Sequence, residues 1–203
     1  MAIRGRPRAF DREQALARAM EVFWVKGLEA ASISDLTAAM GIVSPSLYAA
    51  FGSKEALFRE AVDLYVQTDG AEIWSALTTA QTAYDAVAGF LTTTARLFSR
   101  PDKPSGCMVV LSALHITEAS QAVRAEMAAR RKQNESRLLE RLAQGVEEGE
   151  IASSTDLETV ARFYITVQQG MSIQARDGAS LCALEGVAKS ALAAWGSLTA
   201  SRH

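Results

Sequence analysis

The apolar residues of this chain recur at helical spacing, and the alternation of apolar and polar residues that would indicate strands is nearly absent. The first apolar stripe consists of Leu16, Ala19, Met20 and Phe23. Asp11 and Gln14 stand before this stripe at the spacing of a capping box, and Gly27 is placed to close it. The pattern predicts a first helix between these two signals.

Two short helices and a longer one are predicted next. Ser32 opens the first of them, and Gly41 stops it in the position of a left-handed turn. In the following stretch, SPSLYAAF, Ser44 can cap a helix of about two turns and Pro45 can occupy its first turn, where a missing N–H costs nothing. After the glycine that ends it, Ser53 caps a fourth helix.

The remainder of the chain predicts helices over residues 83–99, 107–116, 118–148, 155–176 and 180–198. The Pro-containing segment RPDKPSG separates the first two of these helices. Thr155 and Glu158 form another capping box, and Gly178 follows the helix that they open. We therefore predict an all-α fold of about nine helices, with an N-terminal three-helix helix-turn-helix domain over residues 1–60 and a C-terminal helical bundle over residues 61–203.

Composition narrows the class of protein further. The chain is 49% hydrophobic and 22% charged, and it has no apolar run of about 18 residues that could span a membrane. No apolar stretch follows the basic N-terminus, so we expect no secretory signal and a cytoplasmic location. Cys107 and Cys182 have no CxxC partner, and His115 near Cys107 has no third or fourth ligand in view, so we expect no metal and no cofactor. Ser, His and Asp are too scattered for a catalytic triad, which makes an enzyme unexpected.

The two short helices joined by a turn with glycine, and backed by another helix, form a helix-turn-helix pattern whose second helix enters the DNA major groove. Small side chains allow such a helix to approach base edges closely. The net charge of −2 hides a basic N-terminal arm, with three arginines and no acid in the first ten residues. Our candidate DNA contacts are Arg4, Arg6, Arg8, Ser32, Ser44, Pro45, Ser46, Tyr48 and Lys54. The alternatives are plain helix capping by the serines, a packed Tyr48 ring and a solvated Lys54 charge.

The segments ALARAMEVFWVKG and ISDLTAAMGIVSPSLYAAFGSKEALF resemble the TetR family of transcriptional regulators. The matching positions are Gly41, Leu47, Tyr48, Phe51, Ser53, Lys54 and Leu57. The chain departs from the family at Val43, where a small polar cap is common, so the reading helix is expected to start at Ser44. The resemblance implies a repressor with a C-terminal domain for dimerisation and effector binding.

The C-terminal part also carries a mixture of aromatic, methionine and polar residues that suits a mostly apolar small-molecule pocket. We expect this pocket between the helices at 83–99, 106–117 and 155–177, with the fourth helix as one wall. Its candidate residues are Trp74, Phe90, Thr94, Phe98, Met108, Leu111, His115, Tyr164, Gln168 and Met171. A plain hydrophobic core would use the same residue types, and a filled core would indicate a regulator that binds no ligand. A third possibility is an all-α carrier or enzyme.

A two-fold homodimer is predicted through the helices at about 155–177 and 180–198. Both contain small residues that allow close helix approach, among them Ala161, Gly170, Ala188, Ala191 and Ala194. Dimerisation would place two reading helices about 34–36 Å apart, which matches successive major grooves of a palindromic operator in double-stranded DNA. The expected partners are therefore this operator, a second copy of the chain and a small hydrophobic effector, without a membrane.

Overall fold

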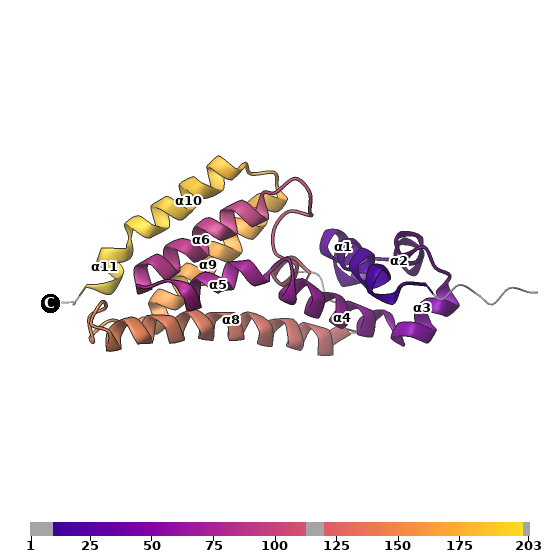
Figure 1. Cartoon of the computed structure of the whole chain (residues 1–203), viewed down its shortest axis with the longest axis horizontal. Helices are drawn as coiled ribbons and strands as arrows, with labels where there is room; N and C mark the ends of the chain where they lie inside the picture. Colours follow the sequence, from indigo (N-terminus) through magenta and orange to yellow (C-terminus); the bar gives the residue numbers. More distant parts are fainter. Residues whose placement is uncertain (1–9, 113–119, 201–203) are drawn as a thin grey trace, which may run out of the picture.

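The computed structural model describes residues 10–112 and 120–200, and within these ranges the chain is helical with no strand (Figure 1). The helical segments are α1 (Arg12–Ala30), α2 (Ile33–Met40), α3 (Ser44–Phe51), α4 (Lys54–Gln67), α5 (Ala71–Thr79), α6 (Ala83–Phe98), α7 (Met108–Leu111), α8 (Gln121–Glu147), α9 (Leu157–Arg176), α10 (Leu181–Ala193) and α11 (Trp195–Thr199). The predicted all-α fold is confirmed. The described part contains eleven segments rather than about nine because α5 escaped prediction and the last predicted helix is divided.

The helix-turn-helix begins and ends where its local signals predict. Ser32 and Asp35 form a complete capping box at the start of α2, since each side chain bonds the backbone N–H of the other. Gly41 ends α2 at φ 69° and ψ 31°, a left-handed conformation in which a side chain would be strained. Ser53 caps α4 by accepting a hydrogen bond from the backbone N–H of Ala56.

Three predicted caps differ in detail. Asp11 caps α1, but the side chain of Gln14 accepts from Arg18 instead of completing a capping box. Ser44 is the first residue of α3 rather than its cap, because Val43 holds the extended capping position without a side-chain hydrogen bond. Asp156, and not Thr155, caps α9 by accepting from the backbone N–H of the residue three positions on.

Two helix ends also differ from prediction. Gly27 interrupts α1 at φ 74° and ψ 176°, but one more helical turn follows it before Ala31. The last predicted helix divides at Ala194 into α10 and α11. The missed helix α5 follows Gly70, which offers no side-chain cap, so no local signal marks its start.

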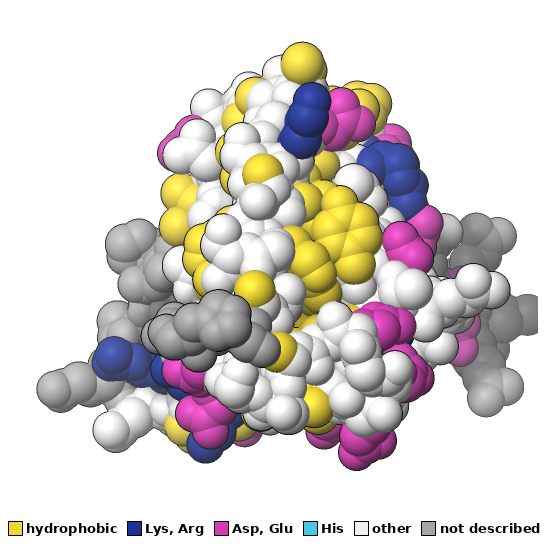
Figure 2. All heavy atoms as spheres, turned by 90° about the vertical axis from the view of Figure 1, so that its left-hand side faces the viewer, with side chains coloured by type: hydrophobic (Ala, Val, Ile, Leu, Met, Phe, Trp, Pro, Cys, Tyr) yellow, Lys and Arg dark blue, Asp and Glu magenta, His cyan; other side chains and the backbone are white. Residues whose placement is uncertain are grey.

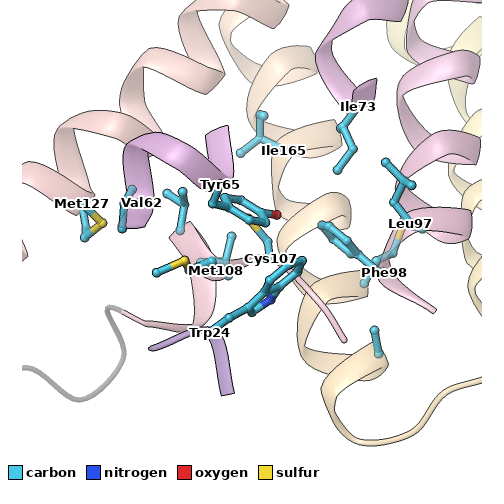
Figure 3. Packing of buried hydrophobic residues seen from close by; sticks show 14 of the residues in the cluster. Trp24, Val62, Tyr65, Ile73, Leu97, Phe98, Cys107, Met108, Met127 and Ile165 are labelled. Atoms are coloured by element: carbon cyan, nitrogen blue, oxygen red, sulfur yellow. The ribbon is translucent and has the colours of Figure 1, made fainter. Parts of the chain in front are cut away.

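The molecule is elongated, with α1–α3 at one end and α10 and α11 toward the other (Figure 1). α4 leads from the first end to the helices of the C-terminal part, and it contains the predicted domain boundary at residues 60 and 61. The buried apolar residues form one continuous cluster across this boundary. Figure 3 shows Trp24 of α1 close to Tyr65, Cys107 and Phe98 in that cluster. The division into two domains therefore stays a prediction.

Candidate functional site

Helix α3 presents one face to the core and the other to solvent. Leu47 and Phe51 are buried, whereas Tyr48 is 48% exposed and Pro45 is exposed. Within the described part of the chain, the hydroxyl groups of Ser44 and Ser46 have no hydrogen-bond partner, so both can contact another molecule. The two alternatives for this helix therefore do not hold: the Tyr48 ring is not packed in the core, and neither Ser44 nor Ser46 caps the helix.

Arg12, which sequence reasoning missed, holds the far end of α3 in place. Its guanidinium donates to the backbone carbonyl of Ala50 at 3.2 Å and to Glu60 of α4 at 2.9 Å. The same group lies 4.3 Å from the centre of the Phe51 ring, where a cation–π contact is favourable. One arginine at the start of α1 thus fixes both α3 and α4, and no spacing rule in the sequence pairs positions so far apart.

The side chain of Lys54 faces the end of α1. Its ammonium group donates to the backbone carbonyl of Glu29 at 3.3 Å and is partly buried, so it is not a freely solvated charge. An ammonium group has three protons, which leaves two for another acceptor such as a phosphate oxygen. Its role as a DNA contact stays a prediction.

A second ion pair fixes α2 against α1. The ammonium group of Lys26 lies 2.8 Å from the carboxylate of Asp35. This hydrogen bond, followed by the bonds from Ser32, lowers the pKa of Asp35 from 3.8 to about 2. The carboxylate that completes the cap of α2 therefore stays ionised over the whole physiological range. The remaining candidates Arg4, Arg6 and Arg8 lie outside the described residues.

Most of the predicted effector residues pack in the core. Seven of them are at most 4% exposed, namely Phe90, Thr94, Phe98, Met108, Tyr164, Gln168 and Met171. Tyr164, for example, donates to the carbonyl of Ala191 at 3.4 Å, and burial raises the pKa of its hydroxyl to about 12. Two of the predicted residues line clefts that we identify among the described residues. Trp74 lines one cleft and Leu111 lines another. His115 lies outside the described residues.

The Thr94 hydroxyl is an exception within this core. It is buried on α6 without a hydrogen-bond partner among the described residues. An unsatisfied buried hydroxyl costs about 1–3 kcal/mol, so Thr94 lowers the stability of this core. Binding by the seven buried residues would require this core to open, and their role stays a prediction.

An arginine at the end of α9 ties the C-terminal part to α1. Gly27 interrupts the helical ladder of α1, and the guanidinium of Arg176 donates to the carbonyls of Trp24 and Val25 just before that break. The Trp24 indole N–H in turn donates to the carbonyl of Gly106 at 3.1 Å, in the loop between α6 and α7. Burial lowers the pKa of Arg176, but an arginine remains charged at physiological pH.

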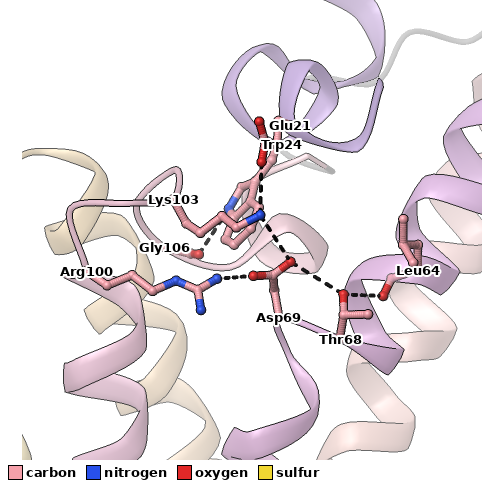
Figure 4. Close-up of polar contacts among 8 residues, drawn as sticks. All are labelled: Glu21, Trp24, Leu64, Thr68, Asp69, Arg100, Lys103 and Gly106. Carbon is pink, nitrogen blue, oxygen red and sulfur yellow. Dashed lines mark hydrogen bonds and ion pairs between the residues drawn. The ribbon is translucent and has the colours of Figure 1, made fainter. Parts of the chain in front are cut away.

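Asp69, directly after α4, is the centre of a second connection (Figure 4). Its carboxylate is only 11% exposed and binds Arg100 and, at 3.9 Å, Lys103 from the loop that follows α6. Lys103 also reaches Glu21 of α1 at 2.9 Å. This group, which we call the Asp69 cluster, therefore joins the end of α4, the loop after α6 and the middle of α1.

The two cysteines differ in their exposure. Cys107 is buried, and burial raises the pKa of its thiol, whereas Cys182 is exposed. In the described ranges, no group of three or more His, Cys, Asp and Glu side chains could hold a metal ion. None of the helices in those ranges is both long and apolar enough to cross a membrane.

Comparison with known proteins places this architecture in a family. Residues 15–61 match the model of the bacterial regulatory proteins of the tetR family, and residues 83–180 match a tetracyclin repressor-like C-terminal domain. The HTH-type transcriptional repressor ComR of Escherichia coli K12 is 36% identical over 193 residues, which cover 95% of this chain and 92% of ComR. The repressor BdcR of the same organism is 33% identical over 194 residues, covering 93% and 92% of the two chains.

Among solved structures, a cysteine mutant of the TetR family transcriptional regulator CifR, complexed with 26 bp double-strand operator DNA, is 47% identical with a TM-score of 0.90. The match covers 94% of this chain and all of the CifR chain. The protein thus has the fold of a helix-turn-helix regulator, and we call α1–α3 with the first part of α4 its reading head. It belongs to the tetR family of bacterial regulatory proteins, and it is a transcriptional regulator rather than an enzyme.

Proposed function

We propose that this chain is a cytoplasmic repressor that binds a palindromic operator as a homodimer and releases it when a small molecule binds the C-terminal part. The observation that carries the proposal is the solvent-facing side of α3, where Tyr48 and Ala49 are exposed and Ser46 is partly exposed, on a helix at the end of the molecule (Figure 1). The solved CifR complex with operator DNA and the repressor names of ComR and BdcR support it. The basic arm would add phosphate contacts to those of the reading helix.

Two groups at the start of α4 fit a phosphate next to α3. The first turn of α4 presents backbone N–H groups, which carry the positive end of the helix dipole. Lys54 keeps two ammonium protons beyond its bond to the Glu29 carbonyl. The side chain of Tyr48, in the helix just before Lys54, is exposed. We assign Tyr48 and Lys54 to phosphate contacts that position α3, and Ser46 to base contacts that select the sequence.

The test is operator binding by the double variant Tyr48→Ala with Lys54→Ala. On a selected operator it should bind more weakly than wild type at every salt concentration, with a smaller slope of log affinity against log salt, because fewer counterions are released. A matched control is Tyr84→Ala with Lys132→Ala, which removes an exposed tyrosine from α6 and an exposed lysine from α8, both outside the proposed dimer helices. Equal affinity and equal salt slope for the reading-head variant and this control would contradict the assignment.

The proposed dimer uses exposed apolar side chains of α9 and α10. Ile173, Leu181 and Val187 are each 41–42% exposed, and Phe163 and Val167 line a groove beside α10. Gly170 faces open space, so another helix can approach it closely, whereas Ala161 and Ala188 are already buried within the chain. Figure 2, which views the end of the molecule near α10 and α11, shows apolar side chains gathered there with charged ones around them.

Release of DNA would follow from a change in the angle or spacing of the two heads. A ligand shifts such an equilibrium only through its different affinity for the two conformations. The contacts that could transmit the shift are the bonds of Arg176 to α1 and the Asp69 cluster, because both join the head to elements of the C-terminal part. A ligand that moves the end of α4 would act on the second of these directly.

A further inference from the structure

A cleft of about 680 Å³ lies between α8 and the corner formed by α4 and α5. Its size is typical of small-molecule sites. Val66 and Leu77 give it an apolar side, and Trp74 lies between them along the chain. Arg137, Glu140 and Arg141 of α8 line the opposite side. An apolar wall facing a few charged groups is the arrangement that holds a small molecule in one orientation.

Trp74 offers an aromatic surface in this cleft. Its ring packs against Phe90 of the core, with the two ring centres 5.1 Å apart, and the Trp74 side chain is only partly buried. The guanidinium of Arg137 lies 5.9 Å from the centre of the same ring. Arg137 makes no ion pair among the described residues, so its donors are available to a ligand beside the indole.

Arg141 adds a second guanidinium that is fixed in place. It is only 5% exposed, and it donates to the carbonyl of Gln81 at 3.3 Å and to the exposed Glu148 at 3.5 Å. A guanidinium has five N–H groups, so these two long bonds do not exhaust its donors. Arginine binds planar carboxylates through paired hydrogen bonds, and a partly desolvated site strengthens them.

We propose that this cleft binds a planar aromatic monocarboxylate, with its ring against Trp74 and its carboxylate on Arg137 and Arg141. Glu140 lines the same side of the cleft and Glu148 is the ion-pair partner of Arg141, so the two arginines already meet two carboxylates, and a singly charged anion fits better than a dianion. This ligand class specifies the effector proposed above, and its effect on DNA release rests on that proposed function. Val66 belongs to the last turn of α4, so a ligand here touches the helix that ends beside Asp69.

The proposal is tested with 2-naphthoate and its neutral isostere 2-naphthamide, by calorimetry on the full-length protein. Naphthoate should bind, and the amide should bind about tenfold more weakly or worse, because it lacks the charge-assisted bonds. Arg137→Gln should weaken naphthoate binding by about tenfold, while Glu140→Gln should tighten it by removing a repelling charge. Arg137 and Glu140 are exposed, so both variants are expected to fold, which a thermal melt verifies.

The matched control is Arg162→Gln, which removes an exposed arginine of α9 that lies outside this cleft. It should leave naphthoate affinity unchanged. Absence of naphthoate binding, equal binding of acid and amide, or equal effects of Arg137→Gln and Arg162→Gln would overturn the assignment. Operator release is measured separately by fluorescence anisotropy of labelled DNA. Naphthoate that binds through Arg137 without releasing DNA would support the cleft and contradict the effector role.

Discussion

The reading head and its connection to the C-terminal part are held together in different ways. In the head, neighbours in sequence fix the short helices, as Ser32 and Asp35 do for α2, and the rings of Phe23 and Phe58 meet edge to face at 5.2 Å in its core. Between the head and the C-terminal part, hydrogen bonds and ion pairs join residues far apart in sequence, and the longest separation is between Arg176 and α1. The ends of the short helices in the head are therefore set locally. The contacts between its helices, such as those of Arg12, and its apolar and polar contacts with the C-terminal part join residues far apart in sequence.

This difference suits a regulator that must keep its reading surface while changing its position. The capping bonds of α2 and α4 lie within the head and do not involve the C-terminal part, so these helices should keep their conformation when the head moves. Polar contacts such as those of the Asp69 cluster can exchange partners, since Lys103 already reaches both Glu21 and Asp69. The following substitutions separate damage to the head from damage to its connection.

The largest effect is expected from Phe58→Ala, within the head. Phe58 is fully buried and its ring contacts Phe23, so truncation leaves a cavity and should lower the free energy of unfolding by about 3–5 kcal/mol. Urea denaturation measures the change. Tyr84→Ala, at a position 43% exposed, serves as the control and should change stability by less than about 1 kcal/mol. Similar losses for the two variants would show that the head core does not carry the stability assigned to it.

Arg176→Met should act on the connection. It leaves the carbonyls of Trp24 and Val25 without their donor, for which we expect a loss of about 1–3 kcal/mol in unfolding free energy. The variant should bind the operator almost as tightly as wild type when no effector is present, because the contacts within the head remain. The larger change is expected in the fraction of DNA that an effector releases. Arg162→Met removes an arginine of the same helix whose side chain is 64% exposed, and should have little effect on either quantity. If the two variants release DNA equally well, Arg176 does not couple the two parts.

The same division explains what could be predicted from the sequence. Gly41, Ser53 and the Pro45 turn of α3 mark local conformation, so the helix-turn-helix was predicted closely. Helix α5 carries no cap signal, and packing against α6 rather than local sequence decides where it lies.

Candidate residues divide in the same way. Tyr48 was a candidate DNA contact with a packed ring as the alternative, and its side chain is 48% exposed; the contact with DNA stays a prediction. For the pocket, aromatic and methionine residues fit a core and a cavity equally, and most of the candidates, Tyr164 among them, pack in the core. The roles of Arg12 and Arg176 depend on contacts between distant segments, which periodicity in a single sequence does not reveal.

Ser32→Ala should give a smaller change than either of the first two variants. It removes the hydroxyl that accepts from the backbone N–H of Asp35, and loss of such a cap costs about 1 kcal/mol. Thermal or urea unfolding measures the difference from wild type. Ser180→Ala, at the cap of α10, makes a comparable test far from the head, since Ser180 accepts from the N–H of Ala183 at 3.2 Å. Of the two, only Ser32→Ala should also weaken operator binding; unchanged operator affinity would remove Ser32 from the candidate DNA contacts.

The smallest effect concerns the ionisation of Asp35. Its pKa in the folded chain is about 2 against an ordinary 3.8, so the carboxylate stabilises the head fully above pH 3.8 and loses this contribution as pH falls toward 2. The largest cause is the hydrogen bond from Lys26, so Lys26→Met should raise the pKa of Asp35 toward 3.8. Carboxyl-detected NMR on both proteins measures the two titrations, and Lys132→Met, at an exposed position of α8, is the control. An Asp35 pKa that stays near 2 in Lys26→Met would mean that the bonds from Ser32 alone hold the carboxylate ionised. The capping box would then set the ionisation of Asp35 without help from α1, and the start of α2 would be fixed by neighbours in sequence alone.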